Sequence, residues 1–367
     1  MKKFLSLLMS IAVAALMLSG CGGEKSARTT AEFVSDMGLG INLGNTFDCS
    51  GDWFARTAEA QETAWGSPII TEKMIKGYAE AGFGVMRLPV SWTVLMDENG
   101  NIDAEFMDRV DEVVGWILDS GMICILNSHH DGWSEKFPQD PDGAMKTYTG
   151  MWEQICKRFK KYGEQLMFES MNEVGFDGMW NQYGGVEGKA EAFEMFNSIN
   201  QAFVDTVRDS GGNNAERHLL IASYWTNIDH ACDSLFEMPD DPAGKCAVSV
   251  HYYAPSTLCI LSEDADWGKA QTEWGSDSDY AELDRYMDMM KTNFADKGIP
   301  VVIGEYGCFG GNKPREVVER WTLSVAEAAL ERGLCPVLWD TPGDEYDREA
   351  ATFRRPDFID ELISLKK

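Results

Sequence analysis

The stretch Leu166-Met-Phe-Glu-Ser-Met-Asn-Glu173 begins as an apolar run and ends on a carboxylate, and Pro300-Val-Val-Ile-Gly-Glu305 shows the same pattern. Each apolar run is typical of a short buried strand. A carboxylate at the end of a buried strand is costly unless it is paired or has a use. Glu173 and Glu305 therefore mark a candidate site, provided that the fold brings the two strand ends together.

Short apolar runs recur along the whole chain, and each is followed by a helical pattern. The runs are continuous rather than alternating, as expected of parallel strands that are covered on both faces. We expect eight strands, near residues 39–43, 85–90, 123–127, 166–170, 219–223, 247–252, 301–304 and 337–339. We expect the helices near residues 71–81, 103–119, 148–162, 189–209, 228–236, 279–297, 314–332 and 355–365.

Eight strand–helix units in about 330 residues predict a single (β/α)8 barrel of the α/β class, spanning residues 32–367. Glycines that follow the expected helices, such as Gly82, Gly121 and Gly333, support these boundaries. A doubly wound sheet is the competing fold, and it usually has a glycine-rich turn that opens directly into a helix. Here Gly40-Ile-Asn-Leu-Gly44 leads into a long polar and aromatic loop, which favours the barrel.

The amino terminus is typical of a targeting segment. Two lysines precede the apolar run Phe4–Leu18, and Leu18-Ser-Gly-Cys21 is similar to a bacterial lipobox. We expect residues 1–20 to be a lipoprotein signal peptide, with lipidation at Cys21, and residues 21–31 to be a flexible tether. The mature chain would then be extracellular, as a cell-surface lipoprotein anchored to a membrane. A plain signal peptide and a secreted enzyme remain the alternative.

Composition narrows the partners and cofactors. Lys+Arg 32 against Asp+Glu 60 gives a net charge of −28, which disfavours nucleic acid and anionic membranes, so we expect membrane contact only through a lipid anchor. We also expect a monomer. The histidines show no metal-site spacing and the cysteines no Cys-x-x-Cys pair, so we expect no metal and no cofactor. The segment 97–103 is similar to a calcium loop, but Ile102 stands where that loop needs glycine, which favours a turn.

Polar and aromatic residues gather where the expected strands end. A barrel places its chemistry at the carboxyl ends of its strands. Each residue alone has a structural explanation: a lone arginine is more often an ion-pair partner, and two adjacent strand histidines point to opposite faces. Their convergence is what points to a site, and two facing carboxylates can split a glycosidic bond. The residues are Asn42, Asn45, Arg87, His129, His130, Asn172, Glu173, His251, Tyr253, Glu305 and Trp339.

The sequence resembles glycoside hydrolase family 5, which contains many bacterial endoglucanases. The resemblance runs from residue 38 to 340 in the family's order, and Ala64-Trp-Gly66 is similar to its endoglucanase and xyloglucanase branch. The matching stretches are Gly40-Ile-Asn-Leu-Gly-Asn-Thr46, Ala64-Trp-Gly66, Val85-Met-Arg-Leu-Pro-Val-Ser-Trp92, Asn127-Ser-His-His-Asp131, Phe168-Glu-Ser-Met-Asn-Glu173, Val250-His-Tyr-Tyr253, Ile303-Gly-Glu-Tyr306 and Leu338-Trp339.

The resemblance implies a role for each matching residue. Glu173 would be the proton donor and base, and Glu305 the nucleophile, kept ionised by Arg87 and Tyr253. His129 and His251 would order the glutamates and the cleaved sugar, Asn172 would bind its 2-hydroxyl, and Trp339 would stack on it. Asn42 and Trp225 complete the supporting set. Val174 stands where the family more often has proline, which touches the loop after Glu173 but not the carboxylate.

The implied activity is that of a retaining endo-β-1,4-glucanase that cleaves cellulose or a related β-glucan by double displacement. Arg87 is expected to lower the pKa of Glu305, which would leave Glu173 as the proton carrier. The alternatives are a β-mannanase, a xyloglucanase or lichenase, and, in another class, a non-catalytic carbohydrate-binding surface lipoprotein. Loop tryptophans suit stacking on sugars, although ordinary loop packing explains each of them equally well. They are Trp53, Trp133, Trp180, Trp225, Trp267 and Trp274.

Overall fold

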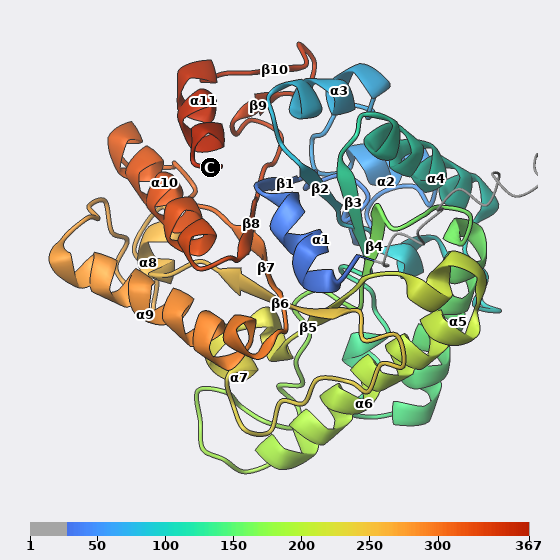
Figure 1. The fold of residues 1–367 in the computed structure, drawn as a ribbon. Helices are drawn as coiled ribbons and strands as arrows, with labels where there is room; N and C mark the ends of the chain where they lie inside the picture. Colours follow the sequence, from blue (N-terminus) through green and yellow to red (C-terminus); the bar gives the residue numbers. More distant parts are fainter. Residues whose placement is uncertain (1–27, 367) are drawn as a thin grey trace, which may run out of the picture.

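The computed structural model describes residues 28–366, in which eight parallel strands close into a barrel in chain order (Figure 1). The barrel closes where the last strand pairs with the first, with Gly40 opposite Val337. The (β/α)8 prediction is therefore confirmed. The strands are β1 (Gly40–Asn42), β2 (Val85–Leu88), β3 (Ile123–Asn127), β4 (Leu166–Glu169), β5 (Leu219–Ala222), β6 (Cys246–Tyr252), β7 (Val301–Tyr306) and β8 (Cys335–Leu338).

Helices surround the strands, and short 3-10 turns and a two-stranded hairpin, β9 (Tyr346–Asp347) and β10 (Thr352–Phe353), fill the connections. Within residues 28–366, no helix combines the length and the apolar character that crossing a bilayer requires. The helices are α1 (Thr30–Met37), α2 (Ala58–Thr63), α3 (Glu72–Glu80), α4 (Ala104–Asp119), α5 (Pro141–Phe159), α6 (Lys189–Asp209), α7 (Ile228–Ala231), α8 (Ser256–Cys259), α9 (Asp277–Asn293), α10 (Arg315–Glu331) and α11 (Pro356–Ser364).

Three helices depart from the predicted ranges by four residues or more, and one of them is α9, which ends at Asn293 rather than near residue 297. Helix α5 begins earlier than expected, at Pro141, because the side chain of Asp140 accepts a hydrogen bond from the backbone N–H of Gly143 and proline suits the first helical position. Helix α7 is shorter than the predicted 228–236 and ends at Ala231.

Helix α1 was not predicted, and it closes the amino-terminal end of the barrel. Thr29 and Glu32 form a capping box at its start. Its buried side chains Phe33, Val34 and Met37 pack with the apolar residues that fill the lower barrel, and Figure 1 shows α1 lying across the ring of strands. The tether predicted for residues 21–31 therefore overlaps the first two residues of a packed helix. The predicted signal peptide and Cys21 lie outside the described residues.

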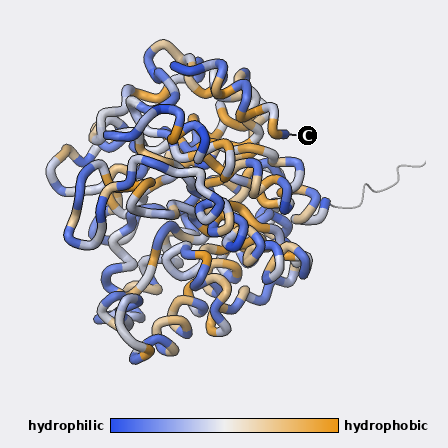
Figure 2. The backbone as a smooth tube through the Cα atoms, turned by 90° about the vertical axis from the view of Figure 1, so that its left-hand side faces the viewer, coloured by the Kyte–Doolittle hydropathy of each residue, from blue (hydrophilic) through white to orange (hydrophobic). Residues whose placement is uncertain are grey.

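The interior of the barrel changes from apolar to polar along each strand. Because residues two apart on a strand face the same side, the apolar layer of Val85 and Met167 is followed by Arg87 and Glu169. The same step leads to the buried Asn127 on β3 and Ser249 on β6. Figure 2 shows hydrophobic stretches gathered inside the molecule and hydrophilic stretches along its outer loops. A layer of charged and polar side chains therefore lies at the carboxyl ends of the strands, above an apolar plug formed by the residues of the lower barrel, which include Val85 and Met167.

Candidate active site

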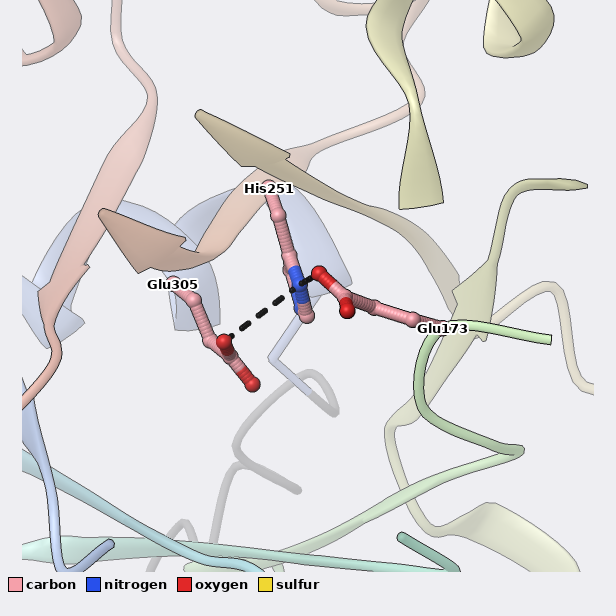
Figure 3. A group of neighbouring side chains, drawn as sticks. All are labelled: Glu173, His251 and Glu305. Carbon is pink, nitrogen blue, oxygen red and sulfur yellow. Dashed lines mark hydrogen bonds and ion pairs between the residues drawn. The ribbon is translucent and has the colours of Figure 1, made fainter. Parts of the chain in front are cut away.

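The two glutamates meet across the mouth of the barrel, with one histidine between them (Figure 3). Glu305 lies in β7, His251 lies in β6, and Glu173 follows β4. His251 Nδ1 lies 2.8 Å from Oε1 of Glu173 and 3.6 Å from Oε2 of Glu305. One nitrogen and one oxygen from each glutamate all lie within 4.8 Å of one another. The barrel thus brings together the two carboxylates that the sequence separates.

Glu305 is held by donors on both of its oxygens. Arg87 Nη1 donates to Oε1 at 2.7 Å, and the hydroxyl of Tyr253 donates to Oε2 at 2.9 Å. His129 Nε2 lies 4.0 Å from Oε1. The side chain is only 7% exposed, so these groups replace water as its partners. Donors to the charged form favour ionisation and fix the direction of the carboxylate.

Arg87 is fully buried and binds four side chains at once. Its Nη1 also donates to the Asn42 side-chain oxygen at 3.0 Å, and its Nη2 donates to that of Asn172 at 2.8 Å. Its Nε donates to Oε2 of Glu169 at 2.6 Å. Asn42 itself is buried and donates to the backbone oxygen of Gly304 at 2.9 Å. Asn42 therefore links the guanidinium to the backbone of β7. The same guanidinium orients the side-chain oxygen of Asn172.

The tautomer of His129 is set by Asn127, which was not among the predicted site residues. The side-chain oxygen of Asn127 accepts from the backbone N–H of Val90 at 3.1 Å, so its NH2 group faces His129 Nδ1, also at 3.1 Å. This places the proton of a neutral His129 on Nε2, the atom that faces Glu305. Burial lowers the pKa of His129 well below its usual value, which keeps the ring neutral.

His130 lies beside His129 and near Glu173. Strand β3 ends at Asn127, so the alternation of strand faces does not continue to the two histidines. Their rings lie 4.4 Å apart, and Glu173 is close enough for its charge to oppose the effect of burial on the pKa of His130. The expectation that at most one of the two histidines faces the mouth assumed that both lie within the strand, whereas β3 ends before them.

Trp339 lies next to His129 and is positioned by its neighbours. Its ring stacks on His129 with an angle of 9° and a centroid distance of 5.9 Å. A Cβ on Gly44 would lie 2.7 Å from the indole, so glycine leaves room for it. Both rings are held at the mouth of the barrel, and the stacking of Trp339 on a sugar stays a prediction.

The loop after Glu173 is tied to Trp225. The backbone N–H of Val174 donates to the oxygen of Asn172 at 2.9 Å, a bond that a proline at this position cannot make. The backbone N–H of Trp225 donates to the oxygen of Val174 at 2.8 Å, and its indole packs so closely on Gly175 that a Cβ there would lie 2.1 Å away. The loop that carries Val174 in place of the usual proline is therefore fixed by its contacts with Trp225.

The other loop tryptophans divide into two groups. Trp133, Trp180 and Trp274 are buried and pack within the protein, so they cannot stack on a ligand. Trp53 is 63% exposed and Trp267 is 59% exposed. Of the predicted set, these two and the half-buried Trp225 remain candidates for stacking on a sugar chain.

The pKa order of the two glutamates is opposite to the expected one in the unliganded protein. Burial raises the pKa of Glu305, and Glu173 adds to this, although His251 and Arg87 act the other way. Burial also acts to raise the pKa of Glu173, but the hydrogen bond and charge of His251, together with the charges of His130 and Arg87, hold that pKa below the ordinary value. The cause is the contact between His251 and Glu173, which the sequence could not reveal. Glu173 is 41% exposed, so a bound sugar would change its surroundings most.

The same three side chains could also hold a divalent cation, because Glu173, His251 and Glu305 offer three ligand atoms close together. The guanidinium of Arg87 lies 2.7 Å from Glu305 and would repel a cation there. The absence of a metal requirement stays a prediction.

Comparison with known proteins places this chain in a family. Residues 47–344 match the sequence model described as Cellulase (glycosyl hydrolase family 5). Endoglucanase A of Ruminococcus albus is 33% identical, over 94% of this chain and 95% of its own length. Endoglucanase A of Clostridium longisporum is 33% identical over 86% of this chain and 60% of its own length, so this chain spans only part of that relative.

Solved structures show the same architecture. A GH5-4 broad specificity endoglucanase from an uncultured bovine rumen ciliate superposes with a TM-score of 0.84 and 38% identity, covering 92% of this chain and 98% of that one. A mutant GH5 lichenase from Caldicellulosiruptor sp. F32, in complex with cellotetraose, gives a TM-score of 0.85 and 30% identity, covering 93% of this chain and 96% of that one. On the family match over most of its length, this chain belongs to glycosyl hydrolase family 5, the cellulase family.

Proposed function

We propose that this protein is a retaining endo-β-1,4-glucanase that hydrolyses internal bonds of cellulose or related β-glucans. The observation that carries the proposal is the approach of Glu173 and Glu305, whose nearest ligand oxygens lie within 4.8 Å. Retaining glycosidases hold their two carboxyl groups about 5–5.5 Å apart, whereas inverting enzymes need about 6.5–9.5 Å to admit a water. The spacing favours retention.

In the first step, a Glu305 oxygen attacks the anomeric carbon of the sugar while the bond from that carbon to the leaving oxygen breaks. Glu173 gives its proton to the leaving oxygen, so the products are a glycosyl ester on Glu305 and a shortened glucan. Arg87 and Tyr253 aim the attacking carboxylate. Cover by the bound sugar would raise the pKa of Glu173 by desolvation, and so supply the protonated acid that this step needs.

In the second step, Glu173 takes a proton from a water, whose oxygen attacks the anomeric carbon from the side that the leaving group vacated. The ester bond breaks, and its electron pair returns to Glu305 as the carboxylate. Two displacements at one carbon restore the original anomeric configuration. Asn172 is proposed to bind the 2-hydroxyl and Trp339 to stack on the sugar at this position.

The names of the relatives support a glucan substrate. Endoglucanases are found among both the curated relatives and the solved structures, and a lichenase is among the latter. None of the relatives and solved structures described above carries a name that points to mannan. The presence of both glutamates in facing positions weighs against a binding protein without catalysis.

Turnover on a polysaccharide panel tests this function. We expect the release of reducing ends from carboxymethylcellulose, lichenan or xyloglucan, and little from mannan, with Glu305→Ala as the inactive control. Proton NMR of the first product from a cello-oligosaccharide should show the β-anomer. An initial α-anomer would overturn retention, and turnover of mannan alone would overturn the choice of substrate.

We also propose that the mature chain is held outside the cell by lipid on Cys21. The support is Leu18-Ser-Gly-Cys21 after a short apolar run. A single acyl chain binds a membrane only marginally, so more than one chain would be needed. Labelling with radioactive palmitate should mark the wild type and not Cys21→Ser, which should be released or misprocessed. Unlabelled wild-type protein free in the medium would favour plain secretion.

A further inference from the structure

The buried carboxylate of Glu169 lies next to the nucleophile's arginine, although it cannot reach the substrate. Its side chain is fully buried in β4, two residues beyond the apolar plug. Oε2 accepts from Arg87 Nε at 2.6 Å, and Oε1 accepts from the hydroxyl of Ser249 at 2.7 Å. We propose that Glu169 is a positioning residue that balances the charge of Arg87, so that Arg87 can aim Glu305 without holding its carboxylate too tightly to react.

The argument begins with one guanidinium between two carboxylates. Arg87 meets Glu169 through Nε and Glu305 through Nη1, and all three side chains are withdrawn from solvent. Burial acts to lower the pKa of Arg87, but Glu169 and Glu305 outweigh it and raise that pKa, so Arg87 stays protonated. The positive charge is thus shared between two anions rather than given to one.

Charge counting shows why this sharing matters in the reaction, and this step rests on the proposed retaining function. In the free enzyme, Arg87 faces two carboxylates. In the glycosyl-enzyme, Glu305 is a neutral ester, and a buried arginine without a counter-charge would be strongly disfavoured. Glu169, which accepts from Arg87 Nε, keeps Arg87 paired in that state. The positioning role therefore belongs to the covalent intermediate as much as to the free enzyme.

Removing the charge of Glu169 should act oppositely on the two chemical steps. Glu305 would then be the only carboxylate paired with Arg87. Arg87 would stabilise that carboxylate more and make it a weaker nucleophile, which slows formation of the ester. The same stabilisation makes Glu305 a better leaving group, so hydrolysis of the ester keeps its rate or gains. A residue that only supports the fold would lower both steps together.

The test is Glu169→Gln, which keeps the shape and removes the charge. Wild-type turnover of dinitrophenyl β-cellobioside first establishes the activity itself. For the variant we expect kcat/KM for cellotetraose to fall about tenfold and the acid limb of its pH profile to move about one unit lower. We also expect the pre-steady-state burst with the dinitrophenyl substrate to shrink while kcat is maintained.

The acid limb reports Glu305 together with the groups that face it, so these groups stay unchanged in the test. They lie on four strands or their extensions and comprise Arg87, His129, Glu173, His251 and Tyr253. Ser249→Ala is the matched control, because it removes the other hydrogen bond to Glu169 and leaves the charge in place. Its acid limb should stay at the wild-type pH.

Two further measurements keep the inference open to refutation. The carboxyl 13C titration of Glu305 needs no turnover, and its midpoint should fall in Glu169→Gln even if the proposed substrate is wrong. If Glu169→Gln fails to fold, Glu169→Asp is the second variant. Its side chain is one carbon shorter, which moves the carboxylate away from Arg87 Nε, so the acid limb should shift in the same direction by a smaller amount. An unshifted limb and titration in the folded variants, or equal losses in kcat and kcat/KM, would overturn the inference.

Discussion

His251 Nδ1 lies 2.8 Å from Glu173 and 3.6 Å from Glu305, so one imidazole nitrogen faces both carboxylates. In the unliganded protein this contact, opposing the effect of burial, holds the pKa of Glu173 below its ordinary value. The contact therefore favours the ionised form of Glu173, the proposed proton donor, until something changes its surroundings. Because the Glu173 side chain is 41% exposed and that of Glu305 is 7% exposed, a substrate can desolvate the first far more than the second.

The first prediction concerns pH. The alkaline limb of kcat should lie at higher pH than the alkaline limb of kcat/KM, because substrate binding raises the pKa of Glu173 and the proton is then retained to higher pH. The two carboxylates titrate as a coupled pair, so the limbs report the pair. Initial rates on cellotetraose across the pH range measure both limbs. Coincident limbs would show that the His251 contact of the free protein has no kinetic consequence.

The second prediction is that the two glutamates are not equivalent. Glu305→Ala should lose nearly all turnover on every substrate, because no ester can form. Glu173→Ala should lose about 100- to 10,000-fold on cellotetraose, yet spare ester formation from dinitrophenyl β-cellobioside, whose leaving group needs no proton. Single-turnover rates on the two substrates measure this. Equal losses on both would contradict the assignment.

The third prediction is that no metal ion is required. The guanidinium of Arg87 beside Glu305 opposes a cation at the three potential ligands, so exhaustive EDTA dialysis should leave kcat/KM within a factor of about two. Added zinc should inhibit, because it would compete for Glu173 and His251. Activity that is lost on dialysis and restored by one divalent ion would prove the site to be a metal centre.

The sequence predicted those parts of the fold that depend on local pattern. Strand β3 occupies the predicted residues, because a continuous apolar run has no other stable place in a parallel sheet. The meeting of Glu173 and Glu305 followed, since the carboxyl ends of all barrel strands share one face. Glu169 was missed although it lies two residues after Met167, on the inward face, because it stands inside the same motif as Glu173.

Other features depend on contacts between distant segments. The pKa order of the glutamates depends on the placement of His251 from another strand, and no local pattern encodes that distance. The tautomer of His129 depends on the backbone of Val90 acting through Asn127. The start of α1, in contrast, does have a local signal, because Thr29 and Glu32 carry the spacing of a capping box. It was missed because the small polar residues before them favoured a tether.

The last prediction concerns that helix. A chain that begins at Arg28 keeps the capping box of Thr29 and the contact of Thr30 Oγ1 with His218 at 3.0 Å, whereas a chain that begins at Ala31 loses both. Loss of an N-cap costs about 1 kcal/mol, so we expect the shorter chain to melt a few degrees lower. Its kcat/KM at 25 °C should be unchanged, because α1 closes the amino-terminal end and the glutamates lie at the other. Thr29→Ala in the longer chain should reproduce part of the loss. Equal melting temperatures by circular dichroism would show that the start of α1 adds no stability, and a lower kcat/KM in folded protein would show that the barrel floor affects the site.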